Sequence, residues 1–198
     1  MIDISNISHN KPYKIFQDYY EKALIKKQEN IEAIVISSIN SSDNIADSRV
    51  VNLKYISQEE WIFFSNYHSI KAKQFKENPK ISALFFWSSC SIQIRIKAKI
   101  FKTGSIFSDE HFSKRSNTKN ALAISSNQSK VIHSYDEVVS RHAEVLKNND
   151  FSKRPDSWGG FSFKPYYFEF WEGNESRLNI RNAYEYTQGK WLHYVLEP

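Results

Sequence analysis

The sequence predicts a mainly β protein, an antiparallel barrel with a few helices packed around it. Aromatic residues make up 15% of the chain, with 14 Phe, 11 Tyr and 5 Trp against only 5 Gly, and such rings pack well on a pleated surface. Residues 92–100 alternate strictly between apolar and polar side chains. Strand-like segments also follow one another without the strand–helix rhythm of a parallel sheet, which favours an antiparallel barrel.

The first part of the chain predicts one helix followed by three strands. Residues 12–28 have apolar side chains at helical spacing, which indicates an amphipathic helix. Residues 33–39 are rich in β-branched side chains and end in a turn-forming segment, Asn40–Asp43, so they predict a strand. Two further strands are predicted at 49–56 and 61–65. The apolar face of the helix consists of Phe16, Tyr19, Tyr20, Ala23 and Leu24.

The middle of the chain predicts a short helix and two strands. Ser69 is expected to cap a helix that runs to Asn78, where Pro79 stops it. Residues 81–87 predict a buried strand, and 92–100 predict the clearest strand of all. One face of that strand carries Ile92, Ile94, Ile96, Ala98 and Ile100, and the other carries Gln93, Arg95, Lys97 and Lys99.

The last part predicts helices at 108–114 and 135–147, then an aromatic strand at 158–171. Strands at 184–187 and 191–196 are expected to form a hairpin around Gln188-Gly189-Lys190. No repeat or linker appears, so residues 1–198 are expected to form a single domain, in which 1–30 is an N-terminal helical arm.

Composition bounds the compartment and the partners. The longest apolar run, 83–87, is too short to cross a bilayer, and the N-terminus lacks a secretory signal. The single cysteine, Cys90, fits a reducing compartment, so a cytoplasmic protein without a membrane partner is expected. The net charge of +5 fits either an anionic partner or a solvated lysine-rich surface.

Several common kinds of site are absent from the sequence. There is no G-x-G-x-x-G, no P-loop and no G-x-S-x-G motif. The six histidines show no metal-ligand spacing, so no metal is expected. His142 lies on the apolar face of a predicted helix, where a packing histidine is the better interpretation.

Three polar clusters remain as candidates for function. Residues 49–54 form a strand with Arg49 and Lys54 on opposite faces, which suits either ligand binding or a solvated edge strand. Residues 66–71 end at a predicted helix start, which attracts phosphate but is also an ordinary capped helix. Residues 171–181 place two arginines four apart after a tryptophan and a glycine, and arginine suits planar anions and rings.

With these clusters in place, the sequence resembles the pyridoxamine 5'-phosphate oxidase family, from about Glu32 to the C-terminal Leu196-Glu197-Pro198. No single motif is decisive, but their order and spacing together are specific. The matching segments are Ser48–Lys54, Phe63–Asn66, Ser69–Ala72, Asn78-Pro79, Phe85–Trp87, Gln93, Asn127–Ser129, Trp158–Phe161, Phe168–Gly173, Arg177-Leu178 and Arg181.

The resemblance implies an antiparallel split β-barrel and a homodimer with FMN at the subunit interface. Ile70 stands where the family usually has an arginine for the FMN phosphate, and losing that bond costs about 1.5–3 kcal/mol. FMN binding is expected to survive the loss. The positions that match the family's FMN contacts are Arg49, Val50, Val51, Asn52, Leu53, Lys54, Phe64, Ser65, Lys71, Gln93, Gln128, Ser129, Trp171 and Arg181.

The positions that match the family's substrate contacts are less well kept. His111 stands where the family has tyrosine, Lys119 where it has serine, Asn179 where it has histidine and Ile180 where it has an acidic residue. Asn179 can donate or accept a hydrogen bond but cannot exchange a proton. The resemblance implies catalytic roles for Arg177 and Asn179. It implies substrate binding by Lys54, His111, Arg115, Lys119, Arg177 and Asn179.

The expected function is FMN-dependent oxidation of pyridoxine or pyridoxamine 5'-phosphate to pyridoxal 5'-phosphate, with oxygen as acceptor. The main alternative is a flavin-dependent oxidase or reductase of the same family with another small substrate, for example of the phenazine-precursor type. A remote alternative is a non-enzymatic nucleic-acid-binding module that uses the basic face of Arg95, Lys97 and Lys99.

Overall fold

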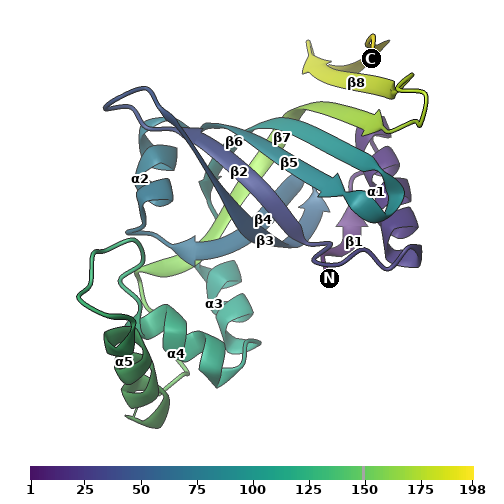
Figure 1. The fold of residues 1–198 in the computed structure, drawn as a ribbon. Coiled ribbons are helices and arrows are strands. Elements are labelled where there is room, and N and C mark those ends of the chain that lie inside the picture. Colours follow the sequence, from purple (N-terminus) through teal and green to yellow (C-terminus); the bar gives the residue numbers. More distant parts are fainter. Residues whose placement is uncertain (149) are drawn as a thin grey trace.

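A computed structural model describes residues 1–148 and 150–198, and its centre is a closed six-stranded antiparallel barrel (Figure 1). Each strand bonds to the next around the ring, and β5 closes the barrel by pairing with β2. The predicted fold class is therefore confirmed. In ring order the strands are β2 (Ala33–Ile39), β3 (Ala46–Gln58), β4 (Glu60–Asn66), β7 (Trp158–Glu172), β6 (Ile92–Lys102) and β5 (Lys80–Trp87).

The barrel is split where β7 changes neighbours. Residues 158–163 of β7 pair with β4, whereas 167–172 pair with β8 (Ile180–Thr187). A hairpin then adds β9 (Lys190–Val195) outside β8, so these strands extend away from the barrel (Figure 1). Gln188 and Gly189 form the two-residue turn with φ of 48° and 81°, which is the conformation that a tight hairpin requires. The predicted hairpin is confirmed.

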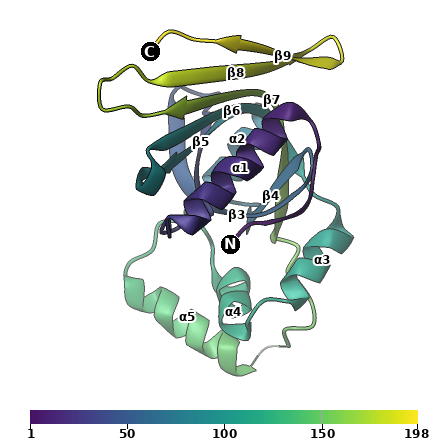
Figure 2. The same cartoon turned by 90° about the vertical axis from the view of Figure 1, so that its right-hand side faces the viewer.

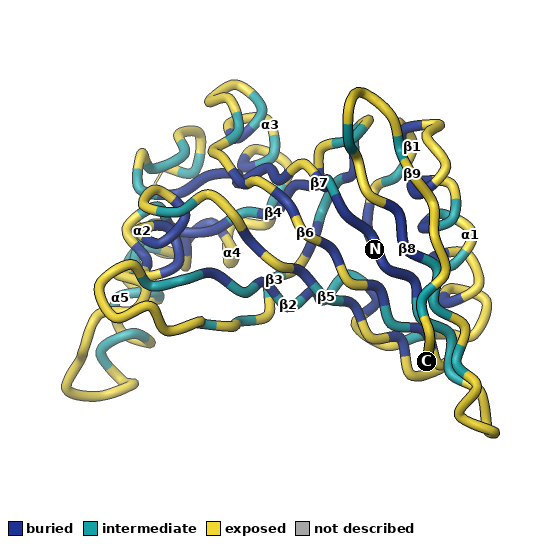
Figure 3. Tube along the Cα trace, turned by 90° about the horizontal axis from the view of Figure 1, so that it is seen from above, coloured by how far each residue is buried: buried dark blue, intermediate teal, exposed yellow. Residues whose placement is uncertain are grey.

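The helix α1 (Lys11–Ile25) lies across one end of the barrel (Figure 2). Its Phe16 is fully buried and packs edge-on against Trp61, with ring centroids 4.5 Å apart. A fully buried ring of this kind contributes about 1.5–3 kcal/mol. The inward residues of 92–100 are buried as predicted, and buried positions concentrate in the barrel strands (Figure 3).

The other α-helices of the described residues are α2 (Ile70–Glu77), α3 (Ser105–Ser113), α4 (Asn117–Ser125) and α5 (Tyr135–Asn148), and a short 3-10 helix, η1 (Ser88–Cys90), follows β5. The predicted helices all form, but α4 and the short strand β1 (Asp3–Ile7) were not predicted. Both depend on long-range partners, since β1 pairs with β3 and α4 packs on α5. His142 joins α5 to α4 through the Thr118 carbonyl at 3.0 Å, which agrees with a packing role. No helix in the two described ranges combines the length and apolarity needed to span a bilayer.

The start of α2 differs from the prediction in its capping. Ser69 occupies the N-cap position, but its hydroxyl donates to the Asn66 carbonyl at 2.8 Å and makes no cap bond. The predicted N-cap position is confirmed, but the side-chain cap bond does not form, because the Ser69 hydroxyl donates to the Asn66 carbonyl. The Ser69 oxygen instead accepts a hydrogen bond from the Lys71 ammonium at 3.3 Å.

Candidate active site

A basic groove of about 530 Å³ lies between the barrel and the helices α3 and α4. Strands β3 and β4 form one wall, and the other lining side chains come from α2, α3, α4, the segments before and after α4, and the start of β7. Many of the predicted site residues meet here, together with Lys114, Ser116 and Trp158, which the sequence did not single out. The predicted residues that line the groove are Val50, Val51, Asn52, Lys54, Phe64, Ser65, Lys71, His111, Arg115, Lys119 and Gln128.

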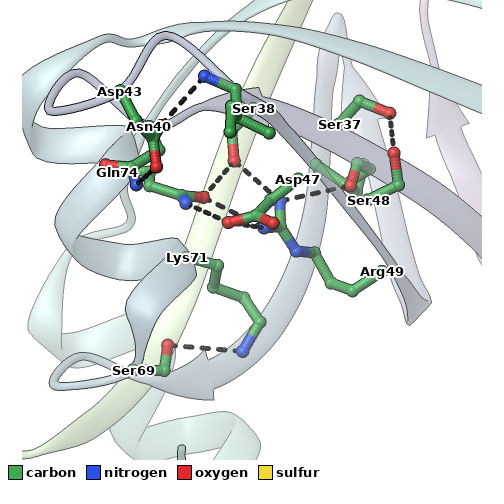
Figure 4. Close-up of polar contacts among 12 residues, drawn as sticks. Ser37, Ser38, Asn40, Asp43, Asp47, Ser48, Arg49, Ser69, Lys71 and Gln74 are labelled. Atoms are coloured by element: carbon green, nitrogen blue, oxygen red, sulfur yellow. Dashed lines mark hydrogen bonds and ion pairs between the residues drawn. The ribbon is translucent and has the colours of Figure 1, made fainter.

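The two cations of β3, Arg49 and Lys54, lie in different surroundings. Arg49 donates to the Ser38 hydroxyl at 2.7 Å and to Gln74 Oε1 at 3.0 Å, so it is tied to β2 and α2 (Figure 4). Lys54 instead lines the groove and lies 4.0 Å from Glu32. The predicted separation of Arg49 and Lys54 is confirmed.

A β-bulge sets where the side chains of β3 point near the groove. The register with β4 shifts between Leu53 and Tyr55, so the bulge falls at Lys54. Leu53 is fully buried in the core, which leaves only its backbone for a ligand, whereas Val50 is 63% exposed.

Lys71 carries a buried ammonium group with no acidic partner. Its side chain belongs to a residue only 9% exposed, and it donates to the hydroxyls of Ser65 and Ser69, both at 3.3 Å. No ion pair in the described part of the chain includes it. Burial, with the nearby charge of Arg49, lowers the pKa of Lys71 to about 8. A buried cation of this kind is a binding point for an anion.

An aromatic stack forms the floor of the groove. The His111 ring lies on the Phe64 ring with centroids 3.7 Å apart and planes 7° apart. Its Nδ1 is 2.8 Å from the Tyr55 hydroxyl. Burial lowers the pKa of His111 to about 4, and the charges of Arg115, Lys54 and Lys114 act in the same direction. His111 is therefore uncharged at neutral pH.

Arg115 lies at the groove with one donor group unused. Its guanidinium carbon is 4.3 Å from the centre of the Trp158 ring, and its Nη2 donates to the Lys119 carbonyl at 3.1 Å. Nη1 is buried and has no hydrogen-bond partner in the described residues. Leaving a buried donor unpaired costs about 1–3 kcal/mol, so this atom points to a ligand with an acceptor group.

The segment after α4 is joined to the end of β4. Gln128 Oε1 accepts from the Ser65 hydroxyl at 3.1 Å, and the Asn66 side chain donates to the Ser126 carbonyl at 3.1 Å. Ser129 follows with a φ of 71° and an exposed side chain. These bonds hold one rim of the groove against the barrel.

A second group of predicted residues lies at the other end of the molecule, on β6, β7 and β8 (Figure 1). Gln93 is paired with Trp171, and Trp171 with Arg181, on neighbouring strands. A depression of about 510 Å³ is lined there by Trp171, Arg177 and Asn179, and it shares no lining residue with the basic groove. One chain therefore places the predicted site residues in two separate groups, which we call the two halves of the predicted site.

Arg181 has a fixed orientation in this second half. It donates to one oxygen of Glu169 through Nε at 3.1 Å and Nη2 at 2.8 Å. Glu169 is only 2% exposed and also accepts from Arg95 at 2.8 Å and from the Tyr167 hydroxyl at 3.0 Å. This network holds the Arg181 guanidinium beside Trp171.

The loop between β7 and β8 carries the residues with expected catalytic roles. Arg177 is exposed and has a φ of 62°. Asn179 Oδ1 accepts from the Asn174 backbone N–H at 3.1 Å, so part of its side chain orders the loop. At Gly173 a Cβ would lie 2.8 Å from the Trp171 ring, so this position requires glycine for Trp171 to pack here.

Some of the groove residues that the sequence did not indicate could have been found from a signal in the sequence, and others could not. Lys114 and Ser116 flank Arg115 and could have been included on adjacency alone. Trp158 begins an aromatic strand and looked like a core residue. Nothing in the sequence connects Tyr55 with His111, because they lie on β3 and α3, 56 residues apart.

Comparison with known proteins agrees with the fold. Residues 158–198 match the family model described as the pyridoxine 5'-phosphate oxidase C-terminal dimerisation region. The pyridoxine/pyridoxamine 5'-phosphate oxidase of Actinobacillus pleuropneumoniae serotype 5b is 32% identical over 191 residues, which cover 96% of this chain and 90% of the relative. That of Christiangramia forsetii is 36% identical over 191 residues, covering 94% and 88%.

A solved structure shares the whole fold. PhzG from Burkholderia lata, in complex with tetrahydrophenazine-1-carboxylic acid, superposes with a TM-score of 0.89 at 24% identity and covers 96% of this chain and 93% of its own. The fold and the curated relatives agree, and the chain belongs to the pyridoxine/pyridoxamine 5'-phosphate oxidase family and is an oxidase of that family.

Proposed function

We propose that this protein is an FMN-dependent oxidase that converts pyridoxine or pyridoxamine 5'-phosphate into pyridoxal 5'-phosphate, with oxygen as the electron acceptor. The observation that carries the proposal is the basic groove, in which Lys71 has no acidic partner and Arg115 Nη1 is unpaired. A groove with these two features fits ligands that carry phosphate. The names of the curated relatives supply the substrate class.

The residues present fit FMN. Lys71 offers a buried ammonium for the phosphate, and Ser65 and Gln128 lie beside it. Ile70, which replaces the family's arginine, is 56% exposed and adds no charge. A structural relative from Nostoc punctiforme, with a TM-score of 0.76 at 12% identity, covering 92% of this chain and 97% of its own, is described as an FMN binding protein. FMN, when bound, would supply the two-electron redox chemistry.

A homodimer would unite the two halves of the site. Within one chain the groove and the depression around Trp171 and Arg177 have no lining residue in common. Six of the eight residues that line the depression, among them Trp171, Arg177 and Asn179, belong to the segment that the matching family model describes as a dimerisation region. We therefore assign the groove of one protomer and the second half of its partner to each complete site, with Gln93, Trp171 and Arg181 on the cofactor.

The protein's own part in the reaction is to bind and orient. Lys54, Arg115 and Lys119 would hold the substrate phosphate, and His111 would add a hydrogen bond. Arg177 would cover the pyridine ring from the other half of the site. Oxidation removes two electrons and two protons, which turns the alcohol into the aldehyde and the amine into an imine. Water then hydrolyses the imine to the aldehyde and releases ammonia. Asn179 can orient the alcohol or amine group but cannot accept a proton. The basic groove thus supplies affinity and geometry.

A spectrum of the FMN-loaded protein tests the proposal. Pyridoxine 5'-phosphate added without oxygen should bleach the flavin band, and air should restore it. Pyridoxal 5'-phosphate should form in proportion to the flavin reduced. A flavin band that stays unchanged would refute the assignment of this substrate, although not the binding of FMN.

A second candidate is an oxidase of the same family with a different substrate. Asn179, Ile180, His111 and Lys119 all depart from the family pattern, and Asn179 is partly engaged by the Asn174 backbone. The relative from Burkholderia lata was solved with an aromatic carboxylic acid. Bleaching by a dihydroaromatic carboxylic acid, with none by pyridoxine 5'-phosphate, would favour this candidate.

The nucleic-acid alternative finds no support in the basic face of β6. Arg95 is paired with the buried Glu169, and the Lys97 ammonium lies 4.7 Å from the centre of the Tyr167 ring. Arg95 and Lys97 are therefore engaged by the protein itself, whereas Lys99 is exposed.

A further inference from the structure

His111 is an uncharged ring among cations, and two contacts fix its position. Its face lies on Phe64, and its edge meets the Tyr55 hydroxyl at Nδ1. Tyr55 is itself held edge-on by Phe107 and Phe64, with ring centroids 5.3 Å and 6.2 Å away. Neither member of the hydrogen bond can therefore rotate freely.

The direction of this hydrogen bond follows from the donors and acceptors available. A neutral imidazole has one N–H donor and one bare nitrogen acceptor. Burial, and to a lesser degree Asp3, raises the pKa of Tyr55, so the phenol keeps its proton. The Tyr55 hydroxyl has no other hydrogen-bond partner within the described chain, so its proton is used within the protein only when it donates to Nδ1. In that arrangement the imidazole proton is on Nε2.

The second ring nitrogen of His111, Nε2, remains accessible. It makes no hydrogen bond to a described residue, and it is absent from the buried unpaired atoms of that part of the chain. It is therefore open to a ligand in the groove that His111 lines. The charged groups around it are Lys54 on β3, Lys114 and Arg115 after α3, and Lys119 on α4, and no carboxylate lines the same groove.

We propose that Tyr55 is a positioning residue that holds His111 as an uncharged Nε2–H donor, and that this donor selects ligand groups that accept hydrogen bonds, namely phosphate or carboxylate oxygens. The inference rests on the proposed function in one respect, that the groove receives the anionic group of the substrate. It adds a specificity role for a residue that touches no ligand itself. A group with only donors, such as an ammonium, would meet Nε2–H and the surrounding cations without an acceptor.

The first test is nitrogen–proton NMR of the His111 ring in FMN-loaded protein at pH 7, assigned by comparison with His111→Gln. The expected signature is one protonated nitrogen, Nε2, and one bare nitrogen, Nδ1, with the Nε2 signal shifting when inorganic phosphate is added. A doubly protonated ring, or a proton on Nδ1, would overturn the proposal. No turnover is needed, so a failure of the oxidase assay leaves this test intact.

The second test compares Tyr55→Phe with the wild type. The variant keeps the ring between Phe64 and Phe107 and removes only the hydroxyl, so we expect binding of inorganic phosphate to weaken by about three- to tenfold. Tyr67→Phe is the matched control, because it removes a similar half-buried hydroxyl that bonds the Gly160 carbonyl at 3.2 Å, away from the groove. Phosphate affinity equal to that of the wild type in Tyr55→Phe would refute the positioning role.

Benzoate in place of phosphate separates the two possible sources of the anionic group. Tighter binding of phosphate would assign the donor to a phosphate ester, and tighter binding of benzoate would assign it to a carboxylate. Both results support an acceptor-selective site. Benzylamine binding as tightly as either anion would contradict it.

Discussion

Replacing Lys71 by methionine should raise the free energy of unfolding of the FMN-free protein and lower that of the FMN-saturated protein. The buried ammonium is held only by two hydroxyls, each at 3.3 Å. Methionine has a similar length and no charge, so it removes the cost of burying the cation. The same change removes the group that we assign to the FMN phosphate. The sign of the stability effect should therefore reverse when FMN is added.

The magnitude follows from the pKa of Lys71. Its fall from 10.5 to about 8 corresponds to about 3.5 kcal/mol at about 1.4 kcal/mol per pKa unit. The groove admits water to this side chain, so we take somewhat less than half of that free energy, about 1.5 kcal/mol. Between pH 8 and 10.5 the unfolded chain binds the proton more strongly than the folded one. The free energy of unfolding should therefore rise with pH in this window, and this contribution should vanish in Lys71→Met.

The assay is urea unfolding of the FMN-free and FMN-saturated proteins at pH 7 and pH 9.5. Without FMN we expect Lys71→Met to be about 1.5 kcal/mol more stable than the wild type at pH 7. FMN affinity should fall by about ten- to a hundredfold, because one charge-assisted hydrogen bond is lost. Lys73→Met is the control, since Lys73 lies on the same helix, is exposed and pairs with Glu77 at 3.9 Å.

Two results would refute this reasoning. A cofactor-free Lys71→Met protein clearly less stable than the wild type would show that the ammonium is not a cost to the fold. Unchanged FMN affinity would show that Lys71 does not hold the phosphate.

Three further predictions concern the second half of the site. Arg177→Ala should abolish turnover while the protein stays yellow, as measured by oxygen uptake and the flavin spectrum, and an active variant would contradict its role. Gly173→Ala should lower FMN affinity by about tenfold in a fluorescence titration, because the new Cβ would meet the Trp171 ring at 2.8 Å. Unchanged affinity would show that Trp171 does not contact the cofactor. Asn179→His restores a side chain that can exchange a proton and should raise kcat for pyridoxine 5'-phosphate. A kcat no higher than that of the wild type would indicate that proton exchange at this position does not limit the reaction.

Much of the architecture could be predicted because the local spacing of apolar and polar residues determines it. The alternation in 92–100 states which side chains enter the core, and the structure buries those residues. The Gln188-Gly189 turn and the apolar spacing of α1 are equally local signals. β1 was missed because it is stabilised by pairing with β3, which is distant in sequence. α4 was missed because it is stabilised by packing against another helix, α5.

The residue types of the candidate site were also visible in the sequence, and their resemblance to a family implied a site at the interface of two subunits. Only the tertiary structure decided that a single chain holds them as two halves at different ends of the barrel. It also tied Arg49 to Gln74 and joined Tyr55 to His111. The physical reason is that periodicity specifies the face of an element on which a side chain lies, whereas contacts between elements depend on strand register, bulges and the change of partner along β7. Those features arise only when the barrel closes.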